Sequence, residues 1–94
     1  MNGANAEQRR VLLAELKALI VVEAQKNLAP ASIGDDEFLF GPATRLALDS
    51  LDALQISIAL QRRFGIRLVD SKETRRILST VGNLADHLLS RPAS

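Results

Sequence analysis

Residues 46–68 read LALDSLDALQISIALQRRFGIRL, and this stretch decides the expected fold. Apolar residues recur within it at helical spacing, which predicts a helix over residues 50–64. Its apolar positions are Leu51, Leu54, Ile56, Ile58, Leu60 and Phe64. These positions cover more than one narrow stripe, so we expect this helix to lie at the centre of the domain. Gly65 is a suitable stop, because glycine adopts the left-handed backbone that ends many helices.

The sequence before this stretch predicts one long helix and one long loop. Residues 6–26 form the helix, with Leu12, Leu16, Leu19 and Ile20 at helical spacing. Residues 27–48 form the loop, because they contain Pro30, Gly34, Gly41 and Pro42. A loop of this length needs apolar anchors on the core. The candidate anchors are Ile33, Phe38, Leu39, Phe40, Leu46 and Leu48.

The sequence after this stretch predicts two more helices. Residues 71–78 form a short one, and Ser79 or Thr80 can cap a last helix that runs through Leu89. No alternating strand pattern of useful length occurs. We therefore expect the 94 residues to form one all-α domain, with an ordered core over about 6–90.

Composition limits the chemistry that the chain can carry. There is no cysteine, so disulfides, thiolate metal sites and a thiol nucleophile of the chain's own are excluded. The acidic run at residues 35–37 is typical of a solvated loop, so no metal site is expected. Glu15 and Lys17 interrupt the apolar run of the first helix, so it is not expected to span a membrane. The N-terminus does not resemble a signal peptide, which favours a cytoplasmic location.

Basic residues gather in the second half of the chain, although the net charge is only +1. Those within residues 61–76 are Arg62, Arg63, Arg67, Lys72, Arg75 and Arg76. Such a patch can attract nucleic acid. However, no aromatic residues are interleaved with it for base stacking, so we do not expect a nucleic-acid partner.

The Asp49-Ser50 pair lies at the start of the predicted central helix. Asp49 is a good N-cap, which contributes about 1 kcal/mol. A helix start also favours a phosphate group, because its amides are unpaired and its dipole is positive there. The only histidine, His87, is far along the chain, and no pattern indicates an oxyanion hole. We therefore interpret Ser50 as an attachment point and assign no catalytic residue.

The stretch that decides the fold resembles the second-helix region of acyl carrier proteins. In that family, Leu-Gly-x-Asp-Ser-Leu opens an apolar helix that ends in Phe-Gly-Ile; here LALDSL and FGI stand at these places. The segments FLFGPATRLALDSLDAL and STVGNLADHL extend the resemblance over most of residues 10–89. The LFG is similar to that of specialised stand-alone carriers, such as those of aryl-polyene or unusual-lipid pathways. The implied fold is a four-helix acyl-carrier-like bundle with a long first loop and a short third helix.

The resemblance also implies a function. Ser50 would carry 4′-phosphopantetheine, which a separate phosphopantetheinyl transferase takes from coenzyme A. Its thiol would hold acyl intermediates as thioesters, so the chain would be a carrier and not an enzyme. Asp49 would orient the site, Leu51 would anchor the helix start and contact partners, and Asp52 would contribute to docking. The implied partners are an acyl-loading enzyme and a ketosynthase or acyltransferase of a dedicated lipid, polyene or polyketide pathway.

The chain departs from the family at several positions. Usually acidic positions of the second helix are here Gln55, Gln61, Arg62 and Arg63. Because like charges in contact cost free energy, we expect partners with an acidic or apolar docking face. A solvated basic surface without a role is the alternative. Ala47 stands where many members have glycine, and it would be strained if its φ is positive.

The cargo and the class of carrier stay open at this point. Candidates for lining an acyl cavity are Leu54, Ile58, Leu84 and Leu88, although ordinary core packing explains them equally well. An aminoacyl or peptidyl carrier has the same fold and arm. The alternative from another class is an unmodified helical interaction module that binds a partner through residues 62–76.

Overall fold

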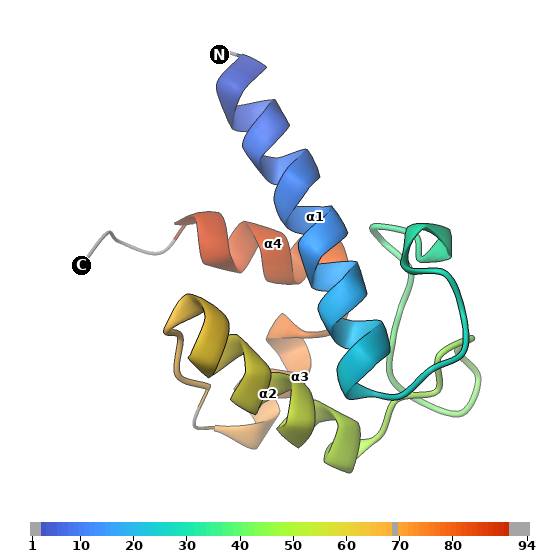
Figure 1. Cartoon of the computed structure of the whole chain (residues 1–94). Coiled ribbons are helices and arrows are strands. Elements are labelled where there is room, and N and C mark those ends of the chain that lie inside the picture. Colours follow the sequence, from blue (N-terminus) through green and yellow to red (C-terminus); the bar gives the residue numbers. More distant parts are fainter. Residues whose placement is uncertain (1–2, 69, 91–94) are drawn as a thin grey trace.

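The computed structural model describes residues 3–68 and 70–90, and within them the regular structure is helical. The elements in chain order are α1 (Gly3–Glu23), the 3-10 turn η1 (Pro30–Ser32), α2 (Ser50–Phe64), α3 (Ser71–Ile77) and α4 (Val81–Ser90). The all-α prediction is confirmed, and α2 has the predicted bounds. The first turns of α1 extend beyond the other helices (Figure 1). None of the described helices is long and apolar enough to cross a membrane.

Local signals fix where the helices end. α1 stops before the predicted residue 26 because Gln25 has a left-handed backbone, with φ 56°, and the Lys26 N–H donates to the Val21 carbonyl at 3.0 Å. Gly65 ends α2 with φ 72°, as predicted. Thr80 caps α4, since its Oγ1 accepts the Asn83 N–H at 2.9 Å.

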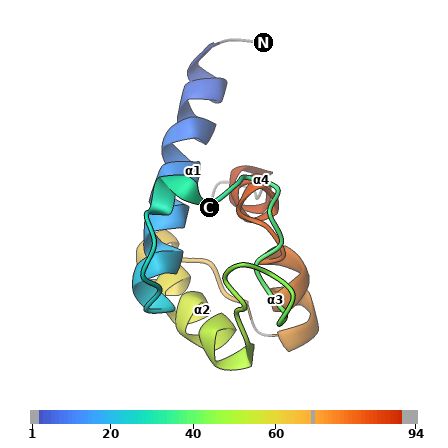
Figure 2. The ribbon, with the colours of Figure 1, turned by 90° about the vertical axis from the view of Figure 1, so that its right-hand side faces the viewer.

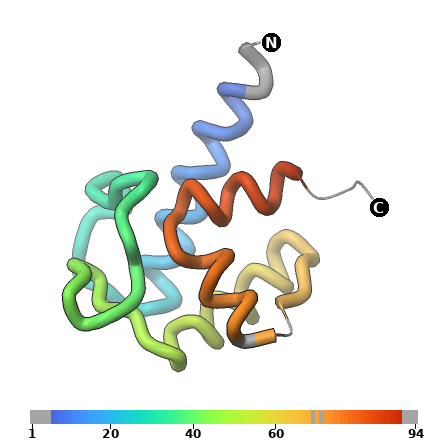
Figure 3. Tube along the Cα trace, turned by 180° about the vertical axis from the view of Figure 1, so that it is seen from behind, coloured from blue at the N-terminus to red at the C-terminus, as the bar shows by residue number. Residues whose placement is uncertain are grey.

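The core lies between α1 and the other helices. α1 packs against α2 and α4, and among the described residues α3 also contacts α2 and α4 but not α1 (Figures 1 and 3). Side chains with no exposed surface come from α1, α2 and α4: Leu16, Ile20, Leu60, Val81, Leu84 and Ala85. Four predicted loop anchors are also buried: Ile33, Leu39, Leu46 and Leu48. The loop therefore completes the core, as its apolar content predicted.

The expected central position of α2 is wrong. Leu51, Leu54 and Ile58 are 62%, 55% and 43% exposed, so Leu54 and Ile58 do not line an interior cavity with Leu84. The buried residues of α2 lie on a single stripe: Ala53, Ile56 and Leu60. Each exposed residue is two positions from a buried one, which is about 200° around the helix. α2 therefore lies at the edge of the bundle with an unpartnered apolar stripe.

Phe38 is likewise wrongly predicted as an anchor, because it is 68% exposed. The chain is extended here: the Leu39 N–H donates to the Ser79 carbonyl at 3.1 Å, and the Leu39 carbonyl accepts the Leu48 N–H at 2.9 Å. In an extended segment, successive side chains point to opposite sides. With Leu39 in the core, Phe38 faces solvent and Phe40 is half-buried.

The long loop crosses from α1 to α4 and then returns to the start of α2 (Figure 2). Asp35 fixes the crossing through two contacts. Its carboxylate pairs with the Lys17 ammonium at 2.6 Å, and its carbonyl accepts the Gly82 N–H at 2.7 Å. The loop is thus tied to both α1 and α4 before it reaches the α2 start.

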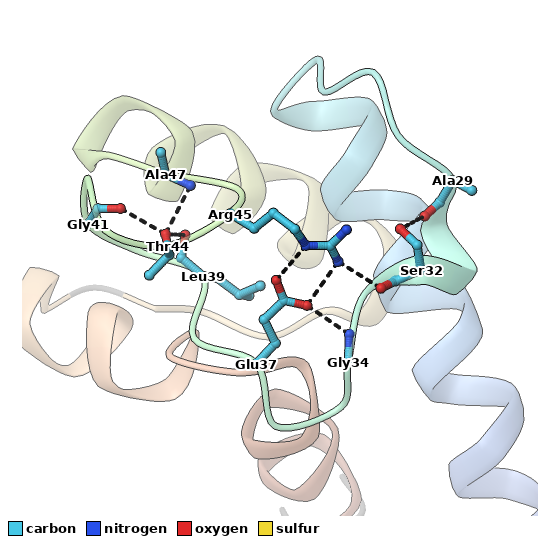
Figure 4. A network of polar contacts seen from close by, with 9 residues as sticks. All are labelled: Ala29, Ser32, Gly34, Glu37, Leu39, Gly41, Thr44, Arg45 and Ala47. Atoms are coloured by element: carbon cyan, nitrogen blue, oxygen red, sulfur yellow. Dashed lines mark hydrogen bonds and ion pairs between the residues drawn. The ribbon is translucent and has the colours of Figure 1, made fainter.

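A polar network fixes the next part of the loop (Figure 4). The Arg45 guanidinium donates to both carboxylate oxygens of Glu37, at 2.9 and 3.0 Å, and to the Ser32 carbonyl at 2.7 Å. Glu37 also accepts the Gly34 N–H at 2.9 Å. These hydrogen bonds lower the pKa of Glu37 from 4.5 to about 2, and those from Arg45 contribute more than the one from Gly34.

This lowered pKa predicts a loss of stability in acid. Ionised Glu37 stabilises the folded chain above its unfolded pKa near 4.5, and this contribution disappears as the pH falls towards about 2. Because the Glu37–Arg45 pair is partly exposed, solvent screening keeps this contribution small. Glu37→Gln should therefore lower the free energy of unfolding at pH 7. The free energy of unfolding of this variant should also fall less between pH 4.5 and about 2 than that of the unchanged chain. Urea unfolding at several pH values measures this; an unchanged pH profile would contradict it.

Candidate functional site

The start of α2 is built by a reciprocal cap. The Asp49 carboxylate accepts the Asp52 N–H at 3.0 Å, and the Asp52 carboxylate accepts the Asp49 N–H at 3.0 Å. The Asp52 amide is the main cause that lowers the pKa of Asp49 below its usual value. The cap fixes the direction in which the chain enters the helix. The predicted N-cap role of Asp49 is confirmed, and Asp52 is its partner.

Ser50 is the first residue of α2, and its side chain is exposed. Within residues 3–68 and 70–90, no group forms a hydrogen bond with its hydroxyl. A hydroxyl that is accessible and unpaired can be modified without breaking any contact of the fold. This is the condition that an attachment point must meet.

The segment before Ser50 is held by hydrogen bonds and is locally strained. The Thr44 hydroxyl donates to the Gly41 carbonyl at 2.7 Å and accepts the Ala47 N–H at 3.0 Å (Figure 4). Ala47 has φ 50°, so the expected strain at this departure from glycine is present. A non-glycine residue in this region costs roughly 1 kcal/mol. The two hydrogen bonds of Thr44 hold Ala47 in this conformation.

A groove opens beside Ser50 on the side of α3. Its volume is about 500 Å³. Its lining comes from α2, from α3 and from the segment between them: Ser50, Ala53, Leu54, Ser57, Leu68, Lys72, Thr74 and Arg75. A group attached to Ser50 can therefore lie in this groove or extend into solvent.

The structure brings some of the predicted site residues together and separates others. Ser50 and Leu51 stand on the first turn of α2, beside the cap, and Leu51 is exposed. Arg62 and Arg63 lie in the last turn, roughly 18 Å away along the helix. Arg63 pairs weakly with Glu15 of α1, at 3.9 Å. Arg62 therefore continues the exposed face of Leu54 and Ile58, whereas Arg63 lies on the side of α2 that faces α1.

Lys72 and Arg75 were not among the predicted site residues. Both were counted in the basic stretch, yet the structure places them on the groove beside Ser50. The sequence does indicate where α3 begins, through its cap residue Asp70, whose carboxylate accepts the Lys72 N–H at 3.0 Å. Nothing local shows that this helix packs beside the start of α2.

The start of α2 is only partly open to an anion. The helix start does not offer its amides freely to a phosphate, because Asp49 already takes the Asp52 amide. The Asp52 amide is therefore not available to a phosphate on Ser50. His87 lies in α4, which packs on α1 and α3 and, within the described residues, not on α2. No cluster of ligands for a metal ion occurs within the described residues.

The chain was compared with protein-family models, with curated proteins and with solved structures. No family model, no curated protein and no solved structure matches it.

Proposed function

We propose that this chain is an acyl carrier whose four helices form a carrier-type bundle and which is modified at Ser50. The observation that carries the proposal is the exposed, unpaired hydroxyl of Ser50 at a capped helix start beside a groove. The resemblance of residues 46–68 to acyl carrier proteins supports it. The arrangement of helices and long loop is compatible with it.

The residues at the α2 start suit a 4′-phosphopantetheine group. A separate transferase would join the Ser50 oxygen to the β-phosphorus of coenzyme A, releasing adenosine 3′,5′-bisphosphate and the hydroxyl proton. The group would supply the thiol that this cysteine-free chain lacks. The Asp49–Asp52 cap would keep the helix start ordered while the hydroxyl reacts.

The exposed face of α2 suggests the kind of partner. Leu51, Leu54 and Ile58 form an apolar stripe that begins next to Ser50. The other end of the helix carries Arg62 and Arg63. A loading enzyme, ketosynthase or acyltransferase with an apolar hollow and carboxylates at its edge would match this face.

Intact-mass measurement tests the modification directly. Incubation with coenzyme A and a broad-specificity phosphopantetheinyl transferase should add the mass of one phosphopantetheine group to nearly all of the protein. Ser50→Ala should add none, while Ser57→Ala, which changes a serine on the same helix, should be modified like the unchanged chain. If no transferase modifies the folded chain, the proposal fails and an unmodified interaction module is favoured.

A further inference from the structure

The groove beside Ser50 is large enough to hold a small chemical group. Its volume of about 500 Å³ lies within the usual range for small-molecule sites, roughly 300–1,000 Å³. Its apolar lining is short, consisting of Ala53, Leu54 and Leu68. Such a surface can cover a few methylene groups, but a long alkyl chain would run past it.

The polar lining of the groove offers few free donors besides its two cations. The Ser57 hydroxyl donates to the Ala53 carbonyl at 2.8 Å. The Thr74 hydroxyl donates to the Asp70 carbonyl at 2.8 Å, and Thr74 is buried. Both hydroxyl protons are therefore already used within their helices. The donors available to a ligand are mainly the Lys72 ammonium and the Arg75 guanidinium.

The described lining of the groove carries two basic side chains, Lys72 and Arg75. None of its described lining residues is acidic. The nearby acids already have partners: Asp49 and Asp52 form the α2 cap, Asp70 caps α3, and Glu73 pairs with Arg76 at 3.4 Å. Within the described residues, neither Lys72 nor Arg75 forms an ion pair.

Arg75 lines the groove, and its guanidinium stacks on Phe40, which lies outside the described lining. Its guanidinium carbon lies 4.7 Å from the centre of the Phe40 ring, a distance typical of a cation–π contact. Such a contact leaves the N–H groups at the edge of the guanidinium available. Arg75 can therefore bind an anion without first giving up a carboxylate partner.

We propose that the groove binds a short acyl group that ends in a carboxylate, that is, a dicarboxylic acid joined to the Ser50 arm as a monothioester. The inference rests on the proposed function. The methylene groups would lie on Leu54 and Leu68, and the terminal carboxylate would bind Lys72 and Arg75. A simple fatty acyl chain would bring its apolar end against two unpaired cations, so it fits less well.

The test compares two acyl groups of equal length on Ser50. The transferase loads the chain from coenzyme A, pentanoyl-coenzyme A or glutaryl-coenzyme A, and intact mass verifies each form. Melting temperatures and amide chemical shifts are then measured. We expect the glutaryl form to melt roughly 4 °C above the pentanoyl form, with shifts at Lys72, Thr74 and Arg75. Lys72→Gln and Arg75→Gln should each reduce this difference by at least half.

Arg76→Gln is the matched control, because Arg76 lies on the same helix but is not among the described lining residues. This variant should keep the full difference. Equal behaviour of the pentanoyl and glutaryl forms would overturn the inference while leaving the carrier function intact. A different outcome is that Lys72→Gln and Arg75→Gln lower the melting temperature of the form loaded from coenzyme A, which has no acyl group, as much as that of the glutaryl form. In that outcome the two cations bind the phosphate of the arm, and the inference is wrong. Failure of every loading reaction would instead overturn the proposed function, and this inference with it.

Discussion

Leu60→Ala should lower the free energy of unfolding by about 3 kcal/mol. Leu60 has no exposed surface and lies on the buried stripe of α2. Truncation removes its transfer free energy and leaves a cavity, and fully buried Leu→Ala changes cost about 2–5 kcal/mol. A domain of this size is stable by only about 5–15 kcal/mol. Urea unfolding followed by far-ultraviolet circular dichroism should show a lower midpoint with the same slope.

Leu54→Ala is the matched control, with the same chemical change on the same helix. Leu54 is 55% exposed, so its truncation should cost less than about 1 kcal/mol. If Leu54→Ala were as damaging as Leu60→Ala, α2 would be buried on both faces, as its apolar pattern predicts. If neither variant lost stability, the packing of α2 on α1 would be wrong.

These two leucines show how far the sequence predicts the fold. Helical spacing and the Gly65 stop were sufficient for the bounds of α2. They were not sufficient for its buried face, because apolar residues lie on both sides of this helix and periodicity cannot rank two apolar stripes. Only packing against α1 shows that Leu60 is inside and Leu54 is outside.

The same limit applies to the site. The Asp49 cap and the position of Ser50 depend on neighbouring residues, so the sequence was enough to predict them. The groove depends on how the segment after Gly65 turns the chain back, which brings Lys72 and Arg75 beside Ser50. Both residues lie more than 20 positions after Ser50 in the sequence, and no local propensity encodes their place beside it.

In the long loop, the apolar pattern predicted which side chains are buried, but it did not predict the hydrogen bonds that fix the loop. Ile33 and Leu39 are buried, as expected. The Asp35 carbonyl, which accepts the Gly82 N–H, had no sequence signal, because any residue can supply a carbonyl. Gly82 itself reads as a weak helix residue, and its role is visible only in the contact that it makes.

Gly82→Ala is therefore expected to destabilise the chain by about 1–2 kcal/mol, although alanine is the better helix former. A Cβ at this position would lie 2.9 Å from the Asp35 carbonyl oxygen and 3.3 Å from a carboxylate oxygen of Asp36. The gain in helix propensity is at most about 1 kcal/mol, whereas overpacking costs about 1–3 kcal/mol. The Asp35 backbone cannot move away easily, because its side chain pairs with Lys17 at 2.6 Å.

Gly34→Ala provides the comparison, because a Cβ there would meet nothing closer than 3.4 Å and the φ of Gly34 is not in the left-handed region. Its cost should stay below that of Gly82→Ala. Hydrogen exchange gives a second measurement: the amide at position 82 should exchange faster in Gly82→Ala, since its bond to the Asp35 carbonyl is pushed apart. A Gly82→Ala chain that is more stable than the unchanged one would mean that helix propensity outweighs the contact. The loop would then not be fixed to α4 at Asp35.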